Sequence, residues 1–515
     1  MWVELALLCV VWAVFRLLPA CLKPPGFDSD AHFYFYRQLK KTGQSPFAGV
    51  PTNVVHSNEA KLPLLWHWLL TLAPFELTYA FCKYINALIE LVFCLAVYLL
   101  LSILMIDNYA FWVVMLYLTT PLWFSTLAIG PRIVGFTPRL SCEILLSTFF
   151  LLVTLGDSIP LYVSLSLLTL IAFVTILSFK FGLQAIVFIS GLYALMTFDV
   201  TPAVAIMIAA VLANWVSGGY FFDAFRNQVE HLIWYFNMVR RGEGAISQRN
   251  AMRAFPVYEP NQAKRFIAGA MNSLFVSNSY TIVLLKLPVL MVLLGFYIAT
   301  LMTPEAALLS TGAFFVVLSA AFIFLLTSSR LFLFLGEAER YLNCIALLIC
   351  VELVNYCIAY GQTYLLYLLT VYGVAIFVLE YLLYPKLTGQ SVMVKDAKDD
   401  LTVLNWLANH RGSLTLLLYP YHAATGLWRI LGRTEHKLVF CFNLNKAFAE
   451  RFESRYAATY PFTNLQKIDE MADDFGLNCV VIDKSKLPGN VDFSARWQRV
   501  DMQCENYLIL VEQGI

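Results

Sequence analysis

The chain has 515 residues, of which 60% are hydrophobic and only 13% are charged, and its formal net charge is +1. Soluble globular proteins contain about 45–50% apolar and about 25% charged residues, so the composition excludes an ordinary soluble protein. A net charge near zero provides no global field for nucleic acid or for an acidic partner. Eleven cysteines occur without a CxxC pair, which predicts neither a disulfide framework nor a zinc site.

Apolar segments of membrane-spanning length fill the first three quarters of the chain. A bilayer core requires about 20 apolar residues per helix, and about eleven segments approach that length. They fall near residues 2–20, 78–104, 108–129, 137–155, 158–178, 180–197, 200–217, 281–303, 305–327, 342–361 and 363–384. The first segment has no small-residue cleavage site, so we expect a retained span and not a signal peptide. The run 62–75 is shorter, and we expect a re-entrant or interfacial helix there.

The polar connections between these spans are distributed unevenly. The long connections 21–61 and 218–280, and the tail from Pro385, all follow odd-numbered spans and are therefore expected on one side of the membrane. The even-numbered connections are a few residues long and contain no Lys or Arg. This asymmetry favours an enzyme that works at one membrane surface over a transporter, which needs gates on both sides and typically has paired broken helices.

The tail from Lys386 changes character, because its apolar runs shorten to strand length. Strands are predicted at Leu414–Tyr419, Leu438–Phe442, Cys479–Ile482 and Tyr507–Val511, with helix-like stretches at Ala447–Tyr456 and Leu465–Phe475 between them. This alternation predicts a small α/β domain with a mostly parallel sheet. We therefore divide the chain into a transmembrane catalytic domain, residues 1–385, and a soluble domain, residues 386–515.

The first long connection carries two carboxylates, Asp28 and Asp30, directly after a Pro-Pro-Gly turn. An aromatic and basic stretch follows them, which favours an interfacial helix against lipid headgroups. A carboxylate at such a boundary is partly desolvated, so its pKa can rise toward the range of a general base. Alternatively, the two residues only cap the helix that begins there, since Asp is a preferred N-cap residue.

Four stretches of the membrane region together resemble the GT-C superfamily of glycosyltransferases. Asp30–Tyr34 resembles the acidic motif of the first loop, and Lys61–Trp66 resembles a proline-containing stretch before the next helix. Leu177–Gly182 resembles a lysine-glycine connection, and Glu337–Leu342 resembles a late Glu-Arg-Tyr-Leu stretch. The sequence departs from the common Asp-Glu pair of the first loop, because Ala31 stands at the second place.

The resemblance implies a polytopic, inverting glycosyltransferase whose donor is a polyprenyl-phosphate-linked sugar. Asp30 would then act as the base or position the acceptor, with Asp28 as its helper. Carboxylate oxygens suit hard cations, so Asp28 and Asp30 are also candidate ligands of a divalent metal such as Mg or Mn. Two carboxylates alone do not complete a metal site.

A lipid phosphate requires cations, and arginine binds phosphate oxygens with two parallel hydrogen bonds. The candidate substrate-binding residues are Glu143, Lys180, Arg139, Arg340, Tyr341, Glu337, His56 and Lys61. Each has a simpler interpretation: Lys and Arg at helix ends extend to headgroups, and Glu143 is spaced to pair with Arg139. Loop 218–280 could hold an anionic acceptor or anionic headgroups, because it carries the basic residues Arg240, Arg241, Arg249, Arg253, Lys264 and Arg265.

These observations lead to one leading hypothesis and two alternatives. We expect a glycosyltransferase of the cytoplasmic (inner) membrane whose active site and soluble domain are extracytoplasmic. Its partners would be a polyprenyl-phosphate-linked sugar, membrane lipids, and a lipid, glycan or protein acceptor of the cell envelope, without nucleic acid. The positive-inside rule opposes this orientation, because all basic connections share one face. The alternatives are a transporter or flippase of a lipid-linked glycan, and a non-catalytic lipid-binding subunit.

Overall fold

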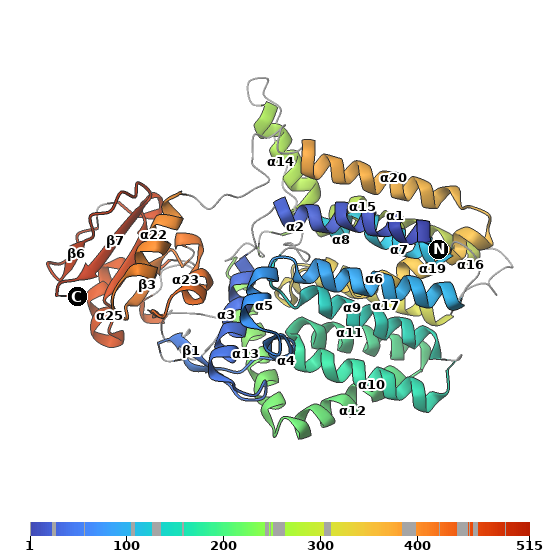
Figure 1. The fold of residues 1–515 in the computed structure, drawn as a ribbon, viewed down its shortest axis with the longest axis horizontal. Helices are drawn as coiled ribbons and strands as arrows, with labels where there is room; N and C mark the ends of the chain where they lie inside the picture. Colours follow the sequence, from blue (N-terminus) through green and yellow to red (C-terminus); the bar gives the residue numbers. More distant parts are fainter. Residues whose placement is uncertain are drawn as a thin grey trace. The chain divides into compact units, whose positions relative to one another are not determined.

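The computed structural model describes residues 2–514 except 23–26, 56, 105–108, 126–134, 157–158, 243–246, 248, 251–262, 303–310, 384–397, 422, 440–451, 453, 457–461 and 490. The chain forms two compact units (Figure 1). The helical unit comprises Met1–Gly26, Glu76–Phe221 and Ala245–Val394. The α/β unit comprises Phe27–Phe75, Phe222–Gly244 and Lys395–Ile515. It therefore includes two segments that the sequence assigned to the membrane domain.

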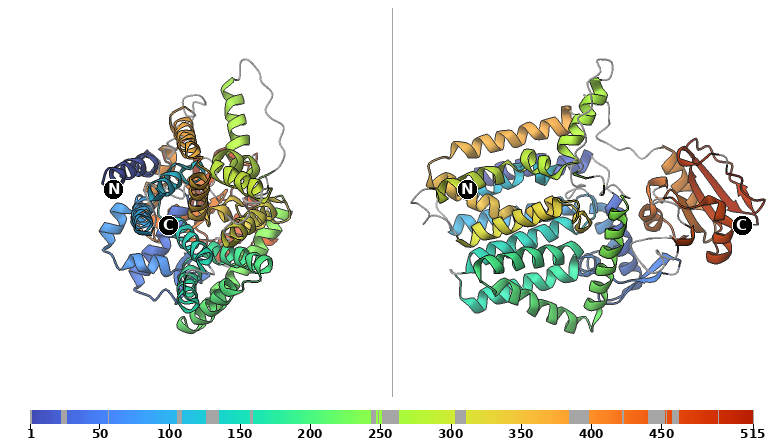
Figure 2. Two further views of the ribbon diagram at one scale, coloured as in Figure 1. Left: turned by 90° about the vertical axis from the view of Figure 1, so that its right-hand side faces the viewer. Right: turned by 180° about the vertical axis from the view of Figure 1, so that it is seen from behind.

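The helical unit contains several helices that are long and apolar enough to cross a bilayer. Among the described residues there are five, or up to seven if each of two bent helix pairs is one span. The five are Trp2–Cys21, Ile85–Ile103, Leu161–Ser178, Lys180–Thr197 and Tyr364–Leu383. They run side by side in the helical unit (Figures 1 and 2). The chain is thus a polytopic helical membrane protein, as the composition predicts.

The remaining predicted spans also contain helices, but these are shorter than the apolar segments suggest. They are α7 (Tyr109–Thr119), α9 (Arg139–Thr154), α12 (Thr201–Val216), α17 (Thr311–Ser328) and α19 (Ala346–Ala359). The predicted span at 281–303 is not one continuous helix, because α15 (Ser279–Lys286) and α16 (Pro288–Leu301) meet at an angle of 82°. Pro288 explains the break, since it has no backbone N–H and is tolerated only in the first turn of the second helix.

Two buried ion pairs join described helices that are distant in sequence. Arg16 lies in a π-helical segment, Ala13–Leu17, and its Nε is 2.5 Å from Oε2 of Glu90 on α6 (Ile85–Leu104). Lys286, at the end of α15, is 2.6 Å from Oε1 of Glu380. Charges within a membrane protein are costly unless they are paired, and the loss of one partner leaves the other uncompensated. Both pairs therefore fix how these helices pack.

The α/β unit is built on a seven-stranded sheet with the order β2-β1-β4-β3-β5-β7-β6. The strands are β1 (Val50–Val54), β2 (Ser57–Ala60), β3 (Thr415–Tyr419), β4 (Lys437–Leu438), β5 (Cys479–Asp483), β6 (Trp497–Arg499) and β7 (Tyr507–Glu512). The central strands β1, β4, β3 and β5 are parallel, whereas β2, β7 and β6 pair antiparallel. The sheet is therefore mixed and not mostly parallel, and the first loop contributes two of its strands.

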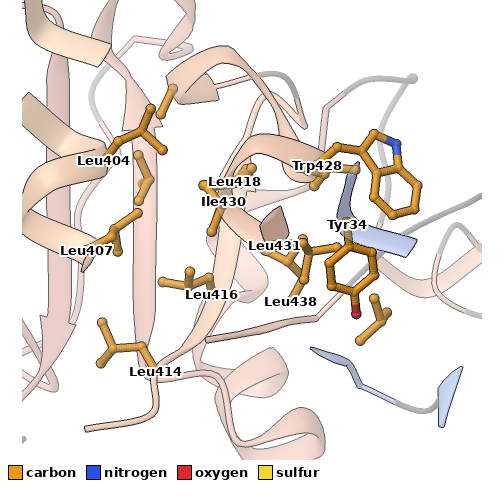
Figure 3. Close-up of a cluster of buried hydrophobic side chains, with 14 of the residues drawn as sticks. Tyr34, Leu404, Leu407, Leu414, Leu416, Leu418, Trp428, Ile430, Leu431 and Leu438 are labelled. Atoms are coloured by element: carbon orange, nitrogen blue, oxygen red, sulfur yellow. The ribbon is translucent and has the colours of Figure 1, made fainter. Parts of the chain in front are cut away.

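Alternating residues of the central strands face two separate hydrophobic cores. On one face, Leu416 and Leu418 pack with residues of α22 (Lys398–Asn409) and α23 (Leu427–Arg433), as Figure 3 shows. Tyr34 of α3 (Phe27–Thr42) belongs to the same core. On the other face, Leu417 packs against α25 (Ile468–Phe475). The two-residue period of a strand produces this division, and it makes the first-loop helix α3 a part of the α/β core.

Candidate active site

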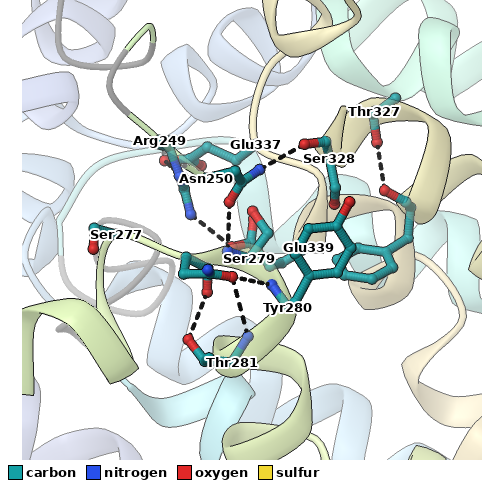
Figure 4. Close-up of polar contacts among 12 residues, drawn as sticks. Arg249, Asn250, Ser277, Ser279, Tyr280, Thr281, Thr327, Ser328, Glu337 and Glu339 are labelled. Atoms are coloured by element: carbon teal, nitrogen blue, oxygen red, sulfur yellow. Dashed lines mark hydrogen bonds and ion pairs between the residues drawn. The ribbon is translucent and has the colours of Figure 1, made fainter. Parts of the chain in front are cut away.

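Two arginines and two glutamates, Arg139, Arg249, Glu337 and Glu339, form a connected set of ion pairs in the helical unit, here called the Arg–Glu cluster. The Glu337 carboxylate is 3.2 Å from Nη2 of Arg139 and 3.4 Å from Nη1 of Arg249. Arg249 also reaches the fully buried Glu339, at 2.6 Å (Figure 4). Burial alone would raise the pKa of Glu337, but Arg139, Arg340 and Arg249 hold that pKa below its ordinary value. The arginines therefore favour the ionised form of Glu337, whereas burial raises the pKa of Glu339 above its ordinary value.

Local structure places each member of the Arg–Glu cluster. Arg139 is the first residue of α9, and Glu339 is the first residue of α18 (Glu339–Asn343). The side chain of Asn250 donates to the carbonyl of Ser328 at 2.8 Å and accepts from the backbone N–H of Ser279 at 2.7 Å (Figure 4). These bonds hold the residue next to Arg249. Of the basic residues of loop 218–280, Arg249 has its charge paired with the two glutamates of the cluster.

Arg340 lies beside this cluster but has a different environment. Its guanidinium carbon is 4.1 Å from the ring centroid of Phe181, and its buried Nε has no hydrogen-bond partner among the described residues. In the part of the chain that the structure describes, Arg340 makes no ion pair. Burial, and then the charge of Arg139, lower the pKa of Arg340 from its ordinary value. An anion bound here would offset both effects, since arginine donates paired hydrogen bonds to phosphate.

The stretches Leu177–Gly182 and Glu337–Leu342 meet in the structure. The Phe181 ring stacks under Arg340 and lies 5.0 Å from the ring centroid of Tyr341. Tyr341 is buried, and its hydroxyl accepts a hydrogen bond from Gln184 on α11 (Lys180–Thr197). A Cβ atom at Gly182 would lie 2.7 Å from Cγ2 of Thr175 and 2.8 Å from Sγ of Cys142. Glycine therefore allows the start of α11, with Lys180 at its first position, to pack closely against α9 and α10 (Leu161–Ser178).

Glu143 is buried one turn into α9 and contacts Arg139 and Asn343. Its Oε1 is 3.5 Å from Nε of Arg139 and accepts a hydrogen bond from Nδ2 of Asn343 at 3.3 Å. The i,i+4 pairing considered from the sequence is therefore present, although at a long distance. Because Arg139 lies closer to Glu337, at 3.2 Å, Glu143 is the weaker partner of that arginine.

Asp30 lies in the fourth position of α3 and forms an ion pair within the α/β unit. Its Oδ2 is 3.2 Å from Nε of Arg429 on α23. The alternative that Asp30 caps the helix is wrong, since α3 already begins at Phe27. Asp28 also lies inside α3, but the structure does not describe its side chain. The sequence contained no signal that Arg429 pairs with Asp30. Arg429 is the single charged residue of the stretch Leu427–Gly432.

Lys61 and His67 also lie in the α/β unit and have identified partners. Lys61 Nζ is 2.6 Å from Oδ2 of Asp223, and that hydrogen bond raises the lysine pKa. His67, on α4 (Leu65–Thr71), is buried, with its Nε2 3.0 Å from Nδ1 of His32. Burial, and then the proximity of His32, lower the pKa of His67. These contacts favour a structural role for Lys61 and His67, and His56 lies outside the described residues.

A divalent metal does not fit the described side chains. Among them, no group of three or more His, Cys, Asp and Glu residues is placed to hold an ion. Asp30, one of the two predicted ligands, instead faces the Arg429 guanidinium. We therefore derive no step through a metal.

Comparison with known proteins adds a fold relationship. No protein-family model matches the sequence, and no curated protein matches it. The apo oligosaccharyltransferase of Archaeoglobus fulgidus is similar in structure, with a TM-score of 0.50 and 12% identity, over 94% of this chain and 69% of that chain. ArnT from Cupriavidus metallidurans bound to undecaprenyl phosphate has a TM-score of 0.51 and 10% identity, over 99% of this chain and 97% of that chain. At these identities the likeness establishes the fold alone, and it confirms the expected polytopic helical architecture followed by an α/β part.

Proposed function

We propose that this protein is a membrane glycosyltransferase that moves a sugar from a polyprenyl-phosphate-linked donor to an acceptor. The observation that supports this most directly is the environment of Arg340, a buried guanidinium without an ion pair among the described residues. ArnT, which has a similar fold, is bound to undecaprenyl phosphate. The phosphate group of such a lipid is the kind of anion that a buried guanidinium would bind.

The proposed reaction is a direct displacement at the anomeric carbon. The acceptor oxygen forms a bond to this carbon while the bond from the carbon to the phosphate oxygen breaks, so the configuration inverts. Asp30 accepts the proton of the acceptor hydroxyl. The departing polyprenyl phosphate keeps the electron pair, and Arg340 and Lys180 neutralise its charge. Tyr341 and Glu337 position the residues around Arg340. Tyr341 packs on Phe181, and Glu337 forms an ion pair with Arg139.

Incubation of the purified protein with a panel of polyprenyl-phosphate sugars and candidate acceptors tests this function. We expect one donor to release free polyprenyl phosphate, with the released amount equal to the sugar transferred. A flippase would instead move the intact donor between the leaflets of a proteoliposome without cleaving it. Donor movement without release of the lipid phosphate would contradict the proposal.

We further propose that Asp30 and the C-terminal residues are extracytoplasmic, as expected for an enzyme of the inner membrane that uses a translocated donor. Exposed serines at positions 45 and 413 provide labelling sites, and Thr363 lies in a short connection expected on the opposite side. In a background with the exposed Cys21 replaced by Ser, S45C and S413C should react with an impermeant maleimide in intact cells. T363C should react only after permeabilisation. The reverse pattern would support the positive-inside orientation and contradict the proposed location.

A further inference from the structure

One face of α3 is attached along its length to the C-terminal part of the α/β unit. Asp30, Tyr34, Arg37 and Lys41 follow the spacing i, i+4, i+7 and i+11, which places them on one side of the helix. Each contacts α23 or the residues directly after it. The distances are 3.2 Å from Asp30 to Arg429, 6.0 Å between the ring centroids of Tyr34 and Trp428, 2.9 Å from Arg37 to Glu435 and 3.1 Å from Lys41 to Glu435.

Backbone groups fix the register of this attachment. Nη1 of Arg37 donates to the carbonyl of Gly432 at 2.8 Å. The hydroxyl of Tyr34 accepts from the backbone N–H of Asn53 in β1 at 2.9 Å. The N–H of Val55, directly after β1, donates to the carbonyl of Leu438 in β4 at 2.8 Å. A helix held by side chains on one face and by a neighbouring strand cannot slide or rotate without breaking several of these bonds.

The two ends of the attachment differ in burial. The side chain of Arg429 is 9% exposed and that of Asp30 is 22% exposed. At the other end, Glu435 is 55% exposed and Lys41 is 58% exposed. Exposed ion pairs contribute little to stability, whereas a largely buried arginine can orient a carboxylate through a charge-assisted hydrogen bond. The pair of Asp30 with Arg429 is therefore suited to hold one carboxylate in a defined place.

We infer that Arg429 is a positioning residue for Asp30, so that the C-terminal part of the chain supplies the cation that orients the first-loop carboxylate. This inference rests on the proposed function, in which Asp30 accepts the proton of the acceptor. The two residues are 399 positions apart in the sequence. The C-terminal part of the α/β unit then contributes to catalysis through Arg429 and is not a separate module. Positioning of a reacting group to better than about 1 Å is worth up to about a hundredfold in rate.

The test compares Arg429→Gln and Arg429→Lys with Glu435→Gln in the full-length protein. Glu435→Gln disrupts the same attachment at its exposed end, away from Asp30. We expect Arg429→Gln to lower kcat by about tenfold to a hundredfold with the donor KM unchanged, because the carboxylate loses its orientation. Arg429→Lys should restore most of the rate, since it keeps the charge. Glu435→Gln should leave kcat unchanged, with a melting temperature no higher than that of the unaltered protein.

A double variant separates positioning from a purely structural role. If Arg429 acts through Asp30, adding Arg429→Gln to Asp30→Asn should lower kcat no further than Asp30→Asn alone. Multiplicative losses, or an Arg429→Gln protein that is less heat-stable but has unchanged kcat, would overturn the inference and leave the transferase function intact. If the unaltered protein turns over no polyprenyl-phosphate sugar, the proposed function fails. The melting temperatures of the unaltered protein, Asp30→Asn, Arg429→Gln and the double variant would still measure the coupling between Asp30 and Arg429.

Discussion

Replacing Asp30 by Asn should lower kcat by at least about a hundredfold, because an amide cannot accept the proton that the acceptor hydroxyl loses. The side chain keeps nearly the same shape, so the backbone of α3 has no reason to change. The melting temperature should nevertheless decrease, since the ion pair between Asp30 and Arg429 at 3.2 Å is lost. Turnover and thermal denaturation measured on the same preparation separate the two effects.

The control for Asp30→Asn is Arg429→Gln, which breaks the same ion pair but leaves the carboxylate in place. The two variants should lose similar thermal stability, whereas Asp30→Asn should lose more activity. An Asp30→Asn protein with near-normal kcat would transfer the role of base to Asp28 or Glu143, or would remove the enzyme hypothesis. Equal activity losses in both variants would show that the ion pair itself is the requirement.

The membrane part of the fold was predictable because the bilayer imposes a length on each apolar segment. A helix was found in each predicted span, and the first-loop helix occurs where the aromatic stretch after Asp30 predicted one. The break at Pro288 was visible in the sequence as a proline, but apolar length alone gave a single span. Proline can kink a helix or begin a new one, and the choice depends on packing that a sequence does not display.

The strands of the first loop could not be predicted from the sequence. The strand β1 is five residues long and contains Pro51, and proline is unfavourable inside a sheet. Its partner β4 has only two residues and comes from the other end of the chain. Pairing between such short and distant strands depends on tertiary structure, since strand propensity largely reports packing against neighbours. The contribution of the first loop to the α/β unit was therefore missed.

The motif indicated where a candidate site lies, but it did not indicate which part each residue of that site plays. The stretch from Glu337 to Tyr341 pointed to Arg340 without indicating which nearby cations are already compensated. That distinction depends on Arg139 and Arg249, which reach Glu337 from separate parts of the chain. The motif thus indicated a candidate region, whereas the structure shows that Arg340, unlike Arg139 and Arg249, makes no ion pair among the described residues.

Replacing Arg340 by Gln should raise the donor KM by about tenfold to a hundredfold, with a smaller effect on kcat. Hydrogen bonds to charged groups contribute about 1.5–3 kcal/mol, and each 1.4 kcal/mol corresponds to a factor of about ten in affinity. The phosphate group is already present in the donor before the reaction. Most of its interaction with Arg340 is therefore made in the ground state. A loss of such uniform binding raises KM more than it lowers kcat.

The matched control is Arg249→Gln, because Arg249 lies in the same region but is paired with Glu337 and Glu339. Removing it leaves the fully buried Glu339 without its arginine, which should lower the free energy of unfolding by about 3–5 kcal/mol. The donor KM should change little. Arg340→Gln should change the stability of the donor-free protein less, because Arg340 makes no ion pair among the described residues and its repulsion from Arg139 opposes its attraction to Glu337 and Glu143.

The two arginine variants therefore have opposite expected profiles. Arg340→Gln should raise the donor KM with a small change in stability, and Arg249→Gln should lower the stability with a normal donor KM. Donor added before heating provides a second measurement, because a ligand that binds only the folded state raises the melting temperature. That increase should be present in Arg249→Gln and strongly reduced in Arg340→Gln. If Arg340→Gln binds the donor normally, the guanidinium extends to headgroups instead, and the phosphate site must be sought at Lys180 or elsewhere in the chain.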